Sequence, residues 1–387
     1  MNRLMRLTRS LRVGIRHRSS FVVPDRAYIE VLGPDSVKLL QGICTNDVTD
    51  LGAQGGCIAA AFLTPKGRVL ADTLIYDMTA KTTDDSLGSS SSAPSSPPSH
   101  LVIETHESML SSLTKFLTMY RLRSKATIKI SADYQTIVTL PGQQSREHEG
   151  SVGKELSLQD PRGSTLGNLT LRAVPSSTGD ETDGGNDVDR SMYNRYRMVH
   201  GLAEGPEIVN KIPLECNLDL LNYISFSKGC YVGQELVART KHKGLVRKRI
   251  LPFLRSLVPP SEHADGSDAG AKFDQLEKEI ADAISSTDAL DLRLDGQEGR
   301  IEVGAKVVKR MGGGANEDVD VDVDVDIGSV VATTRGEELG LAMLRLEHVF
   351  SMGGALSTSN GTNILAFKPS WWPDVDPVTG KALDAVS

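Results

Sequence analysis

The sequence predicts an α+β fold rather than a doubly wound parallel sheet. Strand-like segments are joined in some places by short hairpins and in others by helices, in mixed order. Neither a GxGxxG fingerprint nor a phosphate-binding P-loop is present, so no motif supports nucleotide binding. The 387 residues exceed one ordinary core, and the fractions of 39% hydrophobic and 24% charged residues are typical of a soluble globular protein with two or three domains.

The N-terminal third contains three predicted strand and helix units. Residues 28–48 indicate a strand, a turn and a helix, with Asp35 as the helix N-cap. Residues 56–78 indicate two strands that form a hairpin, turning at residues 65–67, "PKG". Residues 101–130 then indicate a strand, a helix and a further strand, which completes an α+β pattern.

The later part of the chain turns from helix to strand. Residues 191–202, "SMYNRYRMVHGL", predict a helix. Residues 246–255, "VRKRILPFLR", begin a tail rich in strand signals that ends near residues 363–372, "NILAFKPSWW". We therefore expect the C-terminal part to be a β domain.

Four segments interrupt this pattern and are interpreted as insertions. Residues 82–99 are rich in Ser and Pro and are expected to be disordered, and residues 175–189 are acidic and rich in Gly. Residues 259–300 begin with Pro and Gly and contain a charged helical stretch. Residues 312–326 hold a Val-Asp repeat, which we interpret as an acidic hairpin tip or a disordered loop. A calcium loop is excluded because Ile327 stands where an EF-hand needs Gly.

Residues 1–20 differ from the rest, because they hold six arginines, interspersed leucines and no acid. This pattern predicts a mitochondrial transit peptide, and a basic nucleic-acid-binding arm is the alternative. Removal of six positive charges changes the formal net charge of the chain from −7 to −13, so nucleic acid is not an expected partner. No apolar run of about eighteen residues occurs, so we expect neither a transmembrane helix nor a membrane partner.

The stretch "FSKGCYVGQELVART", residues 226–240, carries the strongest chemical signal. A thiolate is the form of cysteine that binds iron, and Lys228 places a cation two residues from Cys230. Gly229 and Gly233 free the backbone to approach the sulfur, and residues 233–240 predict a helix whose positive end lies near the thiol. The candidate residues of this motif are Lys228, Gly229, Cys230, Tyr231, Gly233, Gln234, Glu235 and Arg239.

The purely structural interpretation of Cys230 is that it is a small residue buried in a glycine-bounded turn. The other three cysteines, Cys44, Cys57 and Cys216, lie among apolar residues and are expected to pack in the core. No CxxC pair or Cys/His cluster supplies a self-contained metal site. One thiolate cannot hold an iron–sulfur cluster, which needs four ligands, so a partner would have to supply the rest.

Four blocks together resemble the folate-binding YgfZ/GcvT superfamily, and its mitochondrial iron–sulfur assembly branch, the Iba/Caf-type factors, most of all. They are "LQGICTNDV", "FLTPKGRVLAD", "RYRMVHGLAEGPEIVNKIPLECNLD" and "KGCYVGQELVAR". The resemblance implies two related α+β domains in a ring-like arrangement, closed by a C-terminal antiparallel β-barrel. It assigns residues 1–20 to a presequence, 21–130 and 131–248 to the α+β domains, 249–372 to the barrel and 373–387 to a tail.

The resemblance also implies a function. It points to a factor of the mitochondrial matrix that assists maturation of [4Fe–4S] clusters. Cys230 would be one ligand of a transient [2Fe–2S] or [4Fe–4S] cluster, and an A-type assembly protein would supply further cysteines. Tetrahydrofolate would bind in the central opening.

A folate pocket needs a carboxylate or amide for the pterin edge and a cation for the glutamate tail. The candidates are Asn46, Asp47, Asp72, Arg195, Arg197 and Glu215. Each of them can instead be a cap, a turn residue or a surface charge. The aminomethyltransferase branch resembles "RLEAG" where this chain has "RMVHG", so Val199 replaces a carboxylate that contacts the pterin, and that branch has an acidic residue in place of Cys230.

Two other functions stay open at this point. The chain can be a folate-dependent aminomethyl or one-carbon transferase, or a module that senses folate without touching iron. The loss of the carboxylate at Val199 and the presence of Cys230 favour the assembly factor. The basic run at residues 239–249, "RTKHKGLVRKR", can contact RNA, but without interleaved aromatic residues we favour a solvated strand edge or a patch for an acidic partner.

Overall fold

The computed structural model describes ten stretches of the chain. They are residues 20–51, 56–79, 99–141, 155–174, 187–242, 244–255, 300–311, 323–334, 339–349 and 356–373. The predicted presequence lies outside these residues apart from Ser20. The expected insertions at 82–99, 175–189, 259–300 and 312–326 also lie outside them for most of their length.

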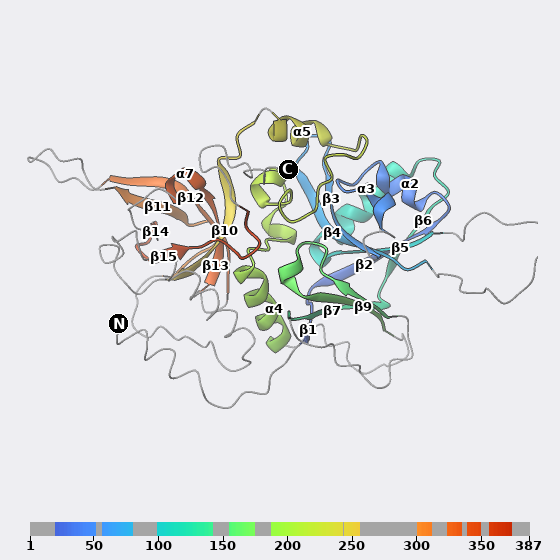
Figure 1. Cartoon of the computed structure of the whole chain (residues 1–387), viewed down its shortest axis with the longest axis horizontal. Coiled ribbons are helices and arrows are strands. Elements are labelled where there is room, and N and C mark those ends of the chain that lie inside the picture. The colour runs from blue at the N-terminus through green and yellow to red at the C-terminus, as the bar shows by residue number, and fades with distance from the viewer. Residues whose placement is uncertain are drawn as a thin grey trace, which may run out of the picture.

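The N-terminal part forms a five-stranded antiparallel sheet with strand order β3-β4-β5-β2-β6. The strands are β2 (Arg26–Gly33), β3 (Cys57–Leu63), β4 (Val69–Asp77), β5 (Ser99–His106) and β6 (Thr127–Ser131). Helices α2 (Ser36–Gln41) and α3 (Leu110–Arg121) pack on this sheet through a shared apolar cluster that contains Leu40, Leu117 and Phe62 (Figure 1). All three strand and helix units predicted for this third of the chain are confirmed. Asp35 precedes α2 as predicted, but its carboxylate accepts from the Lys125 amide and makes no capping hydrogen bond to the helix.

A second antiparallel sheet has the strand order β1-β7-β9-β8. Its strands are β1 (Ser20–Val22), β7 (Tyr134–Thr139), β8 (Glu155–Gln159) and β9 (Asn168–Ala173). Apolar residues of both sheets, such as Tyr76 and Val138, share one large core with Tyr196 of helix α4 (Asp187–Val199). Strand β1 pairs with β7 and forms one edge of the second sheet.

The C-terminal part is a closed six-stranded antiparallel barrel, with strand order β10-β13-β12-β11-β14-β15. The elements are β10 (Lys248–Arg255), β11 (Lys306–Met311), β12 (Val323–Thr333), β13 (Leu339–Arg345), α7 (Leu346–Val349), β14 (Leu356–Thr358) and β15 (Asn363–Ala366). The last part of the Val-Asp repeat, residues 323–326, belongs to β12 and pairs with β11, so those residues lie in a strand of a hairpin.

The predicted α+β class with a closing barrel is confirmed, and Figure 1 shows α4 between the barrel and the two sheets. A segment of short turns and the helix α5 (Gln234–His242) connects α4 to the barrel. Five short 3-10 turns complete the described elements: Val48–Asp50, Glu107–Met109, Ser164–Leu166, Gly205–Glu207 and Pro213–Cys216. No helix in the described stretches is long and apolar enough to cross a membrane.

Candidate functional site

Cys230 lies on the loop that leads into α5, four residues before the helix begins at Gln234. Its side chain is exposed, whereas Cys44, Cys57 and Cys216 are buried. Burial raises the pKa of each of these three thiols, so they are poor sources of a thiolate. The predicted helix after the motif is confirmed, and so is the burial of the other three cysteines.

Two glycines dock the Cys230 loop on the β3–β4 hairpin. Gly233 has a φ of +80°, and a Cβ there would lie 2.5 Å from the backbone oxygen of Thr64. Gly67, in the hairpin turn, has a φ of +76°, and a Cβ there would lie 2.4 Å from the Cβ of Leu236 in α5. The blocks "TPKG" and "CYVGQE", far apart in the sequence, are therefore packed backbone against backbone.

Replacement of Gly233 by Ala is expected to destabilise this packing strongly. The new methyl group meets backbone atoms that cannot move aside, and the positive φ strains any residue with a Cβ, so we expect a loss of about 2 kcal/mol or more in the free energy of unfolding. The matched control is Gly229→Ala, because nothing lies within 4 Å of a Cβ at Gly229. Urea unfolding of both variants tests this, and equal stabilities would contradict the packing argument.

Lys228 holds the same loop from the other side. Its ammonium donates to the backbone oxygens of Cys44 at 2.8 Å and Asn46 at 2.7 Å. It also lies 5.2 Å from the centre of the Tyr231 ring, and burial lowers its pKa. We expected this cation to support the Cys230 thiolate, but the structure uses it to tie the motif to the "CTND" block.

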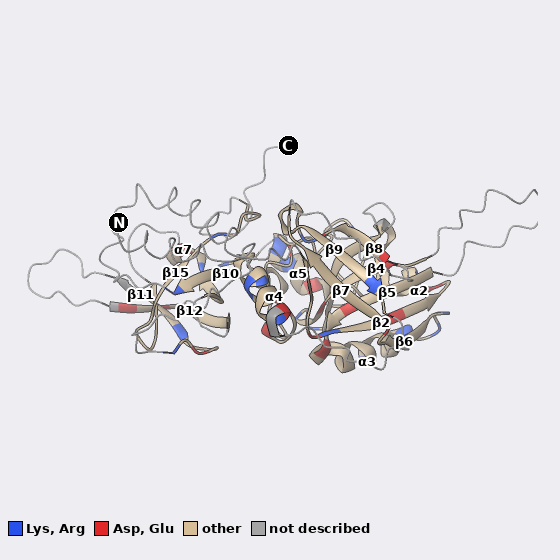
Figure 2. Ribbon diagram, turned by 90° about the horizontal axis from the view of Figure 1, so that it is seen from below, with Lys and Arg blue, Asp and Glu red and all other residues tan. Residues whose placement is uncertain are grey.

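The segment on either side of Cys230, residues 226–245, carries exposed apolar and basic side chains, together with exposed Glu235. Phe226 is 41% exposed, and the Lys241 ammonium lies 4.7 Å from the centre of its ring. Leu245 is 46% exposed. Arg239 and His242 are exposed on α5, whose cationic residues Figure 2 marks in blue. Exposed Lys66 and Arg68 flank Gly67, the residue that α5 contacts.

The basic run at residues 239–249 is not one continuous surface. Val246 and Arg249 are buried, and Arg249 forms an ion pair with Asp219. The run therefore divides into exposed cations on α5 and a structural cation in β10, which supports our preference against an extended RNA-binding stretch.

The six residues proposed for folate do not converge. The Asn46 amide donates to the backbone oxygens of Ala59 and Asn222, both at 2.7 Å. Asp47 caps the turn at residues 48–50 by accepting from the amide of Thr49 at 3.0 Å. Hydrogen bonds from Thr49 also lower the pKa of Asp47. Both residues therefore stabilise the loop that Lys228 contacts.

The two candidate cations lie on α4. Arg197 forms a bidentate ion pair with Glu207, at 2.8 and 2.7 Å, so its charge is already matched inside the protein. Arg195 is partly exposed on the same helix. Glu215 is half-buried, and burial raises its pKa. Of the six candidates, only Asp72 lines the small polar cavity between the two sheets.

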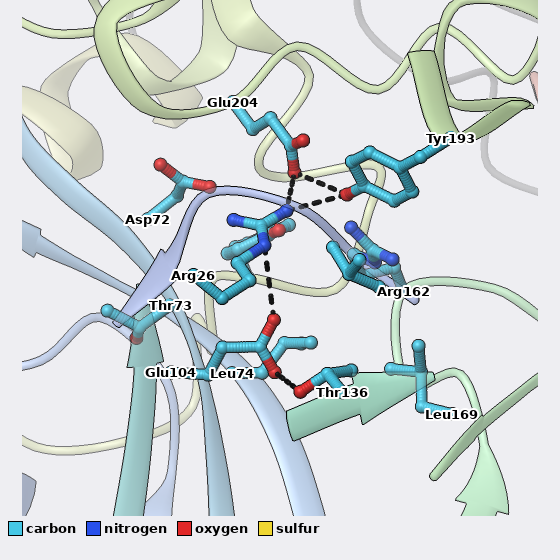
Figure 3. Close-up of a pocket in the computed structure, with 12 residues that line it drawn as sticks. Arg26, Asp72, Thr73, Leu74, Glu104, Thr136, Arg162, Leu169, Tyr193 and Glu204 are labelled. Atoms are coloured by element: carbon cyan, nitrogen blue, oxygen red, sulfur yellow. Dashed lines mark hydrogen bonds and ion pairs between the residues drawn. The ribbon is translucent and has the colours of Figure 1, made fainter. Parts of the chain in front are cut away.

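This polar cavity has Arg26 at its centre (Figure 3). The Arg26 guanidinium donates to Glu204 at 2.5 Å and to the Tyr193 hydroxyl at 2.6 Å. It also lies 3.2 Å from Glu104. The residues that line the cavity are Val23, Arg26, Asp72, Thr73, Leu74, Glu104, Thr136, Arg162, Leu169, Tyr193, Glu204 and Tyr223.

Sequence reasoning missed Arg26, Glu104, Arg162, Tyr193 and Glu204. Glu204 lies in the family-like block at residues 195–219, but nothing in that block singled it out, and the other four lie outside the four blocks. The one local signal was a carboxylate on the buried face of a strand. Glu104 stands in the apolar run "LVIETH", where a charge needs an internal partner.

The carboxylates of the cavity differ in electrostatic environment. Burial alone would raise the pKa of Glu204, but Arg26, Arg197 and Arg162 outweigh this effect and lower it to about 2. Asp72 accepts one hydrogen bond, from the Gly205 amide at 2.8 Å. Burial and the neighbouring Glu204 raise the pKa of Asp72. The pKa values of Asp72 and Glu204 therefore move in opposite directions from their usual ones.

The ion pairs of Glu204 predict an acid-sensitive fold. Its pKa falls from 4.5 in the unfolded chain to about 2 in the folded one, so its stabilisation is complete above pH 4.5 and is lost as the pH falls towards 2. The loss is of the order of 3 kcal/mol. Urea unfolding should therefore show a large stability difference between the parent and Glu204→Gln above pH 4.5, and a smaller difference near pH 2. A difference that does not change with pH would contradict the assignment.

The described cavity does not fit a pterin. The cavity has room for about one water, because the centre of a water molecule can occupy only about 10 Å³ of it. A bicyclic ligand would have to displace Arg26 from Glu204 and Glu104 and leave buried charges unpaired. The cavity therefore supports no reaction step through folate.

Comparison with known proteins agrees with this architecture. The family model described as CAF17, C-terminal beta-barrel domain, matches residues 325–374. A crystal structure of the glycine cleavage system aminomethyltransferase T from Bartonella henselae superposes with a TM-score of 0.54. The superposition covers 95% of this chain and 88% of that one, and at 12% identity it shows the fold alone.

Curated relatives are more informative. The mitochondrial iron–sulfur cluster assembly factor IBA57 homolog of Mycosarcoma maydis is 31% identical over 390 residues, covering 92% of this chain and 85% of the relative. The mitochondrial IBA57 of Mus musculus is 32% identical over 266 residues, covering 64% and 69% of the two chains. The Neurospora crassa homolog is 34% identical, over 69% of this chain and 59% of its own length. By this similarity, which extends along most of its length, the chain belongs to the IBA57 family of mitochondrial iron–sulfur cluster assembly factors.

Proposed function

We propose that this protein acts in mitochondrial iron–sulfur cluster assembly, with Cys230 as one ligand of a cluster shared with a partner protein. The observation that carries the proposal is that, of the four cysteines in the chain, only Cys230 is exposed. It stands on a loop held by Lys228 and by the backbone packing of Gly67 against α5. A held, exposed thiol is a suitable ligand at a protein–protein junction.

The number of ligands that an iron–sulfur cluster needs implies that a partner protein takes part. A [2Fe–2S] or [4Fe–4S] cluster needs four ligands, and the chain offers one accessible thiol. No group of three or more His, Cys, Asp or Glu residues in the described stretches can hold a metal ion. We infer that an A-type assembly protein supplies the remaining cysteines and that the product is a [4Fe–4S] cluster delivered to client proteins.

Charge supports this arrangement. A cluster bound by four thiolates is an anion, and α5, the helix that follows the Cys230 loop, carries exposed Arg239 and, over the Phe226 ring, Lys241. Positive charge beside the ligand attracts an anionic cluster and an acidic partner surface. The proposed location is the mitochondrial matrix, with removal of residues 1–20 on import. A mature protein that still begins at Met1 would contradict that removal.

The experiment is anaerobic reconstitution of the chain together with an A-type partner. We expect a mixed complex that carries iron and shows thiolate-to-iron absorbance, whereas the chain alone retains no cluster. Unchanged iron content and absorbance of the partner, with no complex on a sizing column, would overturn the proposal.

The alternative, a folate-dependent aminomethyl or one-carbon transferase, requires a pterin site. Buried Val199 stands where the resemblance expects a carboxylate, and the described cavity holds about one water. These two observations favour the assembly factor. Folate binding stays a prediction, and a rise in the melting temperature with tetrahydrofolate concentration would support it.

A further inference from the structure

Three exposed apolar side chains lie on or beside β6, the edge strand of the five-stranded sheet. Met119, Leu122 and Ile130 are 59%, 83% and 52% exposed, and they are three of the six large apolar residues exposed in the described stretches. They come from the end of α3, the loop after it and the edge strand β6, which Figure 1 shows close together. This concentration needs an explanation, because exposed apolar residues are normally scattered.

The same surface is basic. Residues 108–132 contain five cations and no acid, in a chain whose formal net charge is −7. All five cations, Lys115, Arg121, Arg123, Lys125 and Lys129, are exposed. Among nearby carboxylates, Glu30 lies 3.5 Å from Lys129 and Asp35 accepts from the Lys125 amide, while Glu107 and Asp133 stand just outside this range of residues. Lys129 alternates with Ile130 along β6 and pairs with Glu30 on the other face of the sheet, so we call the three apolar residues and the other four cations the Leu122 patch.

Leu122 occupies a backbone position that suits glycine. Its φ is +45° and its ψ is −112°, and the Ser124 amide donates to the Arg121 oxygen at 2.8 Å. This is the first central position of a type II′ turn, where Gly is strongly favoured. A leucine there is strained, and at 83% exposure its side chain gains little packing inside the protein in return.

The loop that carries Leu122 is held firmly. The Lys125 amide donates to the Asp35 carboxylate at 2.6 Å, and the Asp35 amide donates to the Lys125 oxygen at 3.4 Å. Gly33 allows this contact, since a Cβ there would lie 2.4 Å from the Lys125 oxygen. The fold therefore presents a strained apolar residue outwards, between Arg121 and Arg123, on a fixed support.

We propose that the Leu122 patch docks the protein on the surface of an anionic lipid bilayer. Leu122 and its apolar neighbours enter the interfacial layer while the flanking cations pair with lipid phosphates. The exposed apolar residues are aliphatic, whereas nucleic-acid surfaces use aromatic residues for stacking. An exposed leucine between two arginines matches the layering of a bilayer interface, where apolar side chains enter below the phosphates and cations stay at their level. Our expectation of no membrane partner rested on the lack of a spanning helix, which peripheral docking does not require.

The test uses vesicles of phosphatidylcholine alone and of equal parts phosphatidylcholine and phosphatidylglycerol. The full-length chain carries six serines in place of its N-terminal arginines, so that residues 1–20 cannot account for binding. We expect it to sediment with the anionic vesicles only, and less so as salt is raised. Absence of binding to the anionic vesicles, or equal binding to both kinds, would overturn the proposal.

Variants in the same background locate the surface. Leu122→Gly is expected to weaken binding about tenfold while its melting temperature is not lowered, because Gly suits the turn. The pair Arg121→Ser and Arg123→Ser is expected to weaken it by about tenfold or more. Val303→Ser, at a residue 65% exposed beside the barrel, is the matched control and should bind as the parent does. If the Leu122 and arginine variants also bind as the parent does, the proposal is wrong.

Discussion

The Cys230→Ser variant is expected to fold like the parent protein and to lose the cluster that it shares with its partner. The side chain is exposed, so exchange of sulfur for oxygen should change the free energy of unfolding by less than about 0.5 kcal/mol. The hydroxyl, however, is not a soft thiolate and cannot replace it on iron. Anaerobic reconstitution with the A-type partner should then give a complex without the thiolate-to-iron absorbance and with less iron.

The other three cysteines provide matched controls. Cys44, Cys57 and Cys216 are buried, so a serine at each places a hydroxyl in an apolar setting and costs about 1–3 kcal/mol of stability. Their variants should still support the shared cluster, provided that they remain folded. If Cys230→Ser gives the same spectrum and iron content as the parent, Cys230 is not a ligand, and its exposed thiol plays no part in holding the cluster.

The largest loss of stability is expected for Arg249→Ala. Arg249 is 1% exposed. It forms a bidentate ion pair with Asp219, at 2.9 and 3.0 Å, and donates to the Leu214 oxygen at 2.8 Å. Truncation leaves the buried Asp219 carboxylate without this partner, which costs about 3–5 kcal/mol. Urea unfolding measures the effect.

Two comparisons separate the ion pair from a general effect of lost charge. Arg247→Ala removes an exposed cation two residues away and should change stability by less than about 0.5 kcal/mol. Adding Asp219→Asn to Arg249→Ala should recover part of the loss, because the second change removes the unpaired charge. If the double variant is less stable than Arg249→Ala, the carboxylate is not the source of the penalty.

Local patterns in the sequence were sufficient to predict the order of the strands and helices and to single out Cys230 as a chemically reactive residue. The strand, turn and helix of residues 28–48, the hairpin at Pro65–Gly67 and the helix after Gly233 follow from periodicity and turn residues, and each is present in the structure. The single cysteine in a glycine-bounded motif was also visible in the sequence, and so were the three that proved to be buried. These properties depend on neighbours within a few residues, so a linear pattern is enough to predict them.

Tertiary structure alone decided which charges meet. Arg26 and Glu204 are 178 residues apart in sequence and form a short hydrogen bond between the two sheets. Lys228 was expected to serve the nearby thiol, yet its ammonium binds backbone oxygens about 180 residues away, at Cys44 and Asn46. Asn46 and Arg197, chosen for a ligand, are engaged by other parts of the protein. The physical reason is that a buried charge or amide must find a partner wherever the packed fold brings one close, and no local sequence pattern specifies that partner.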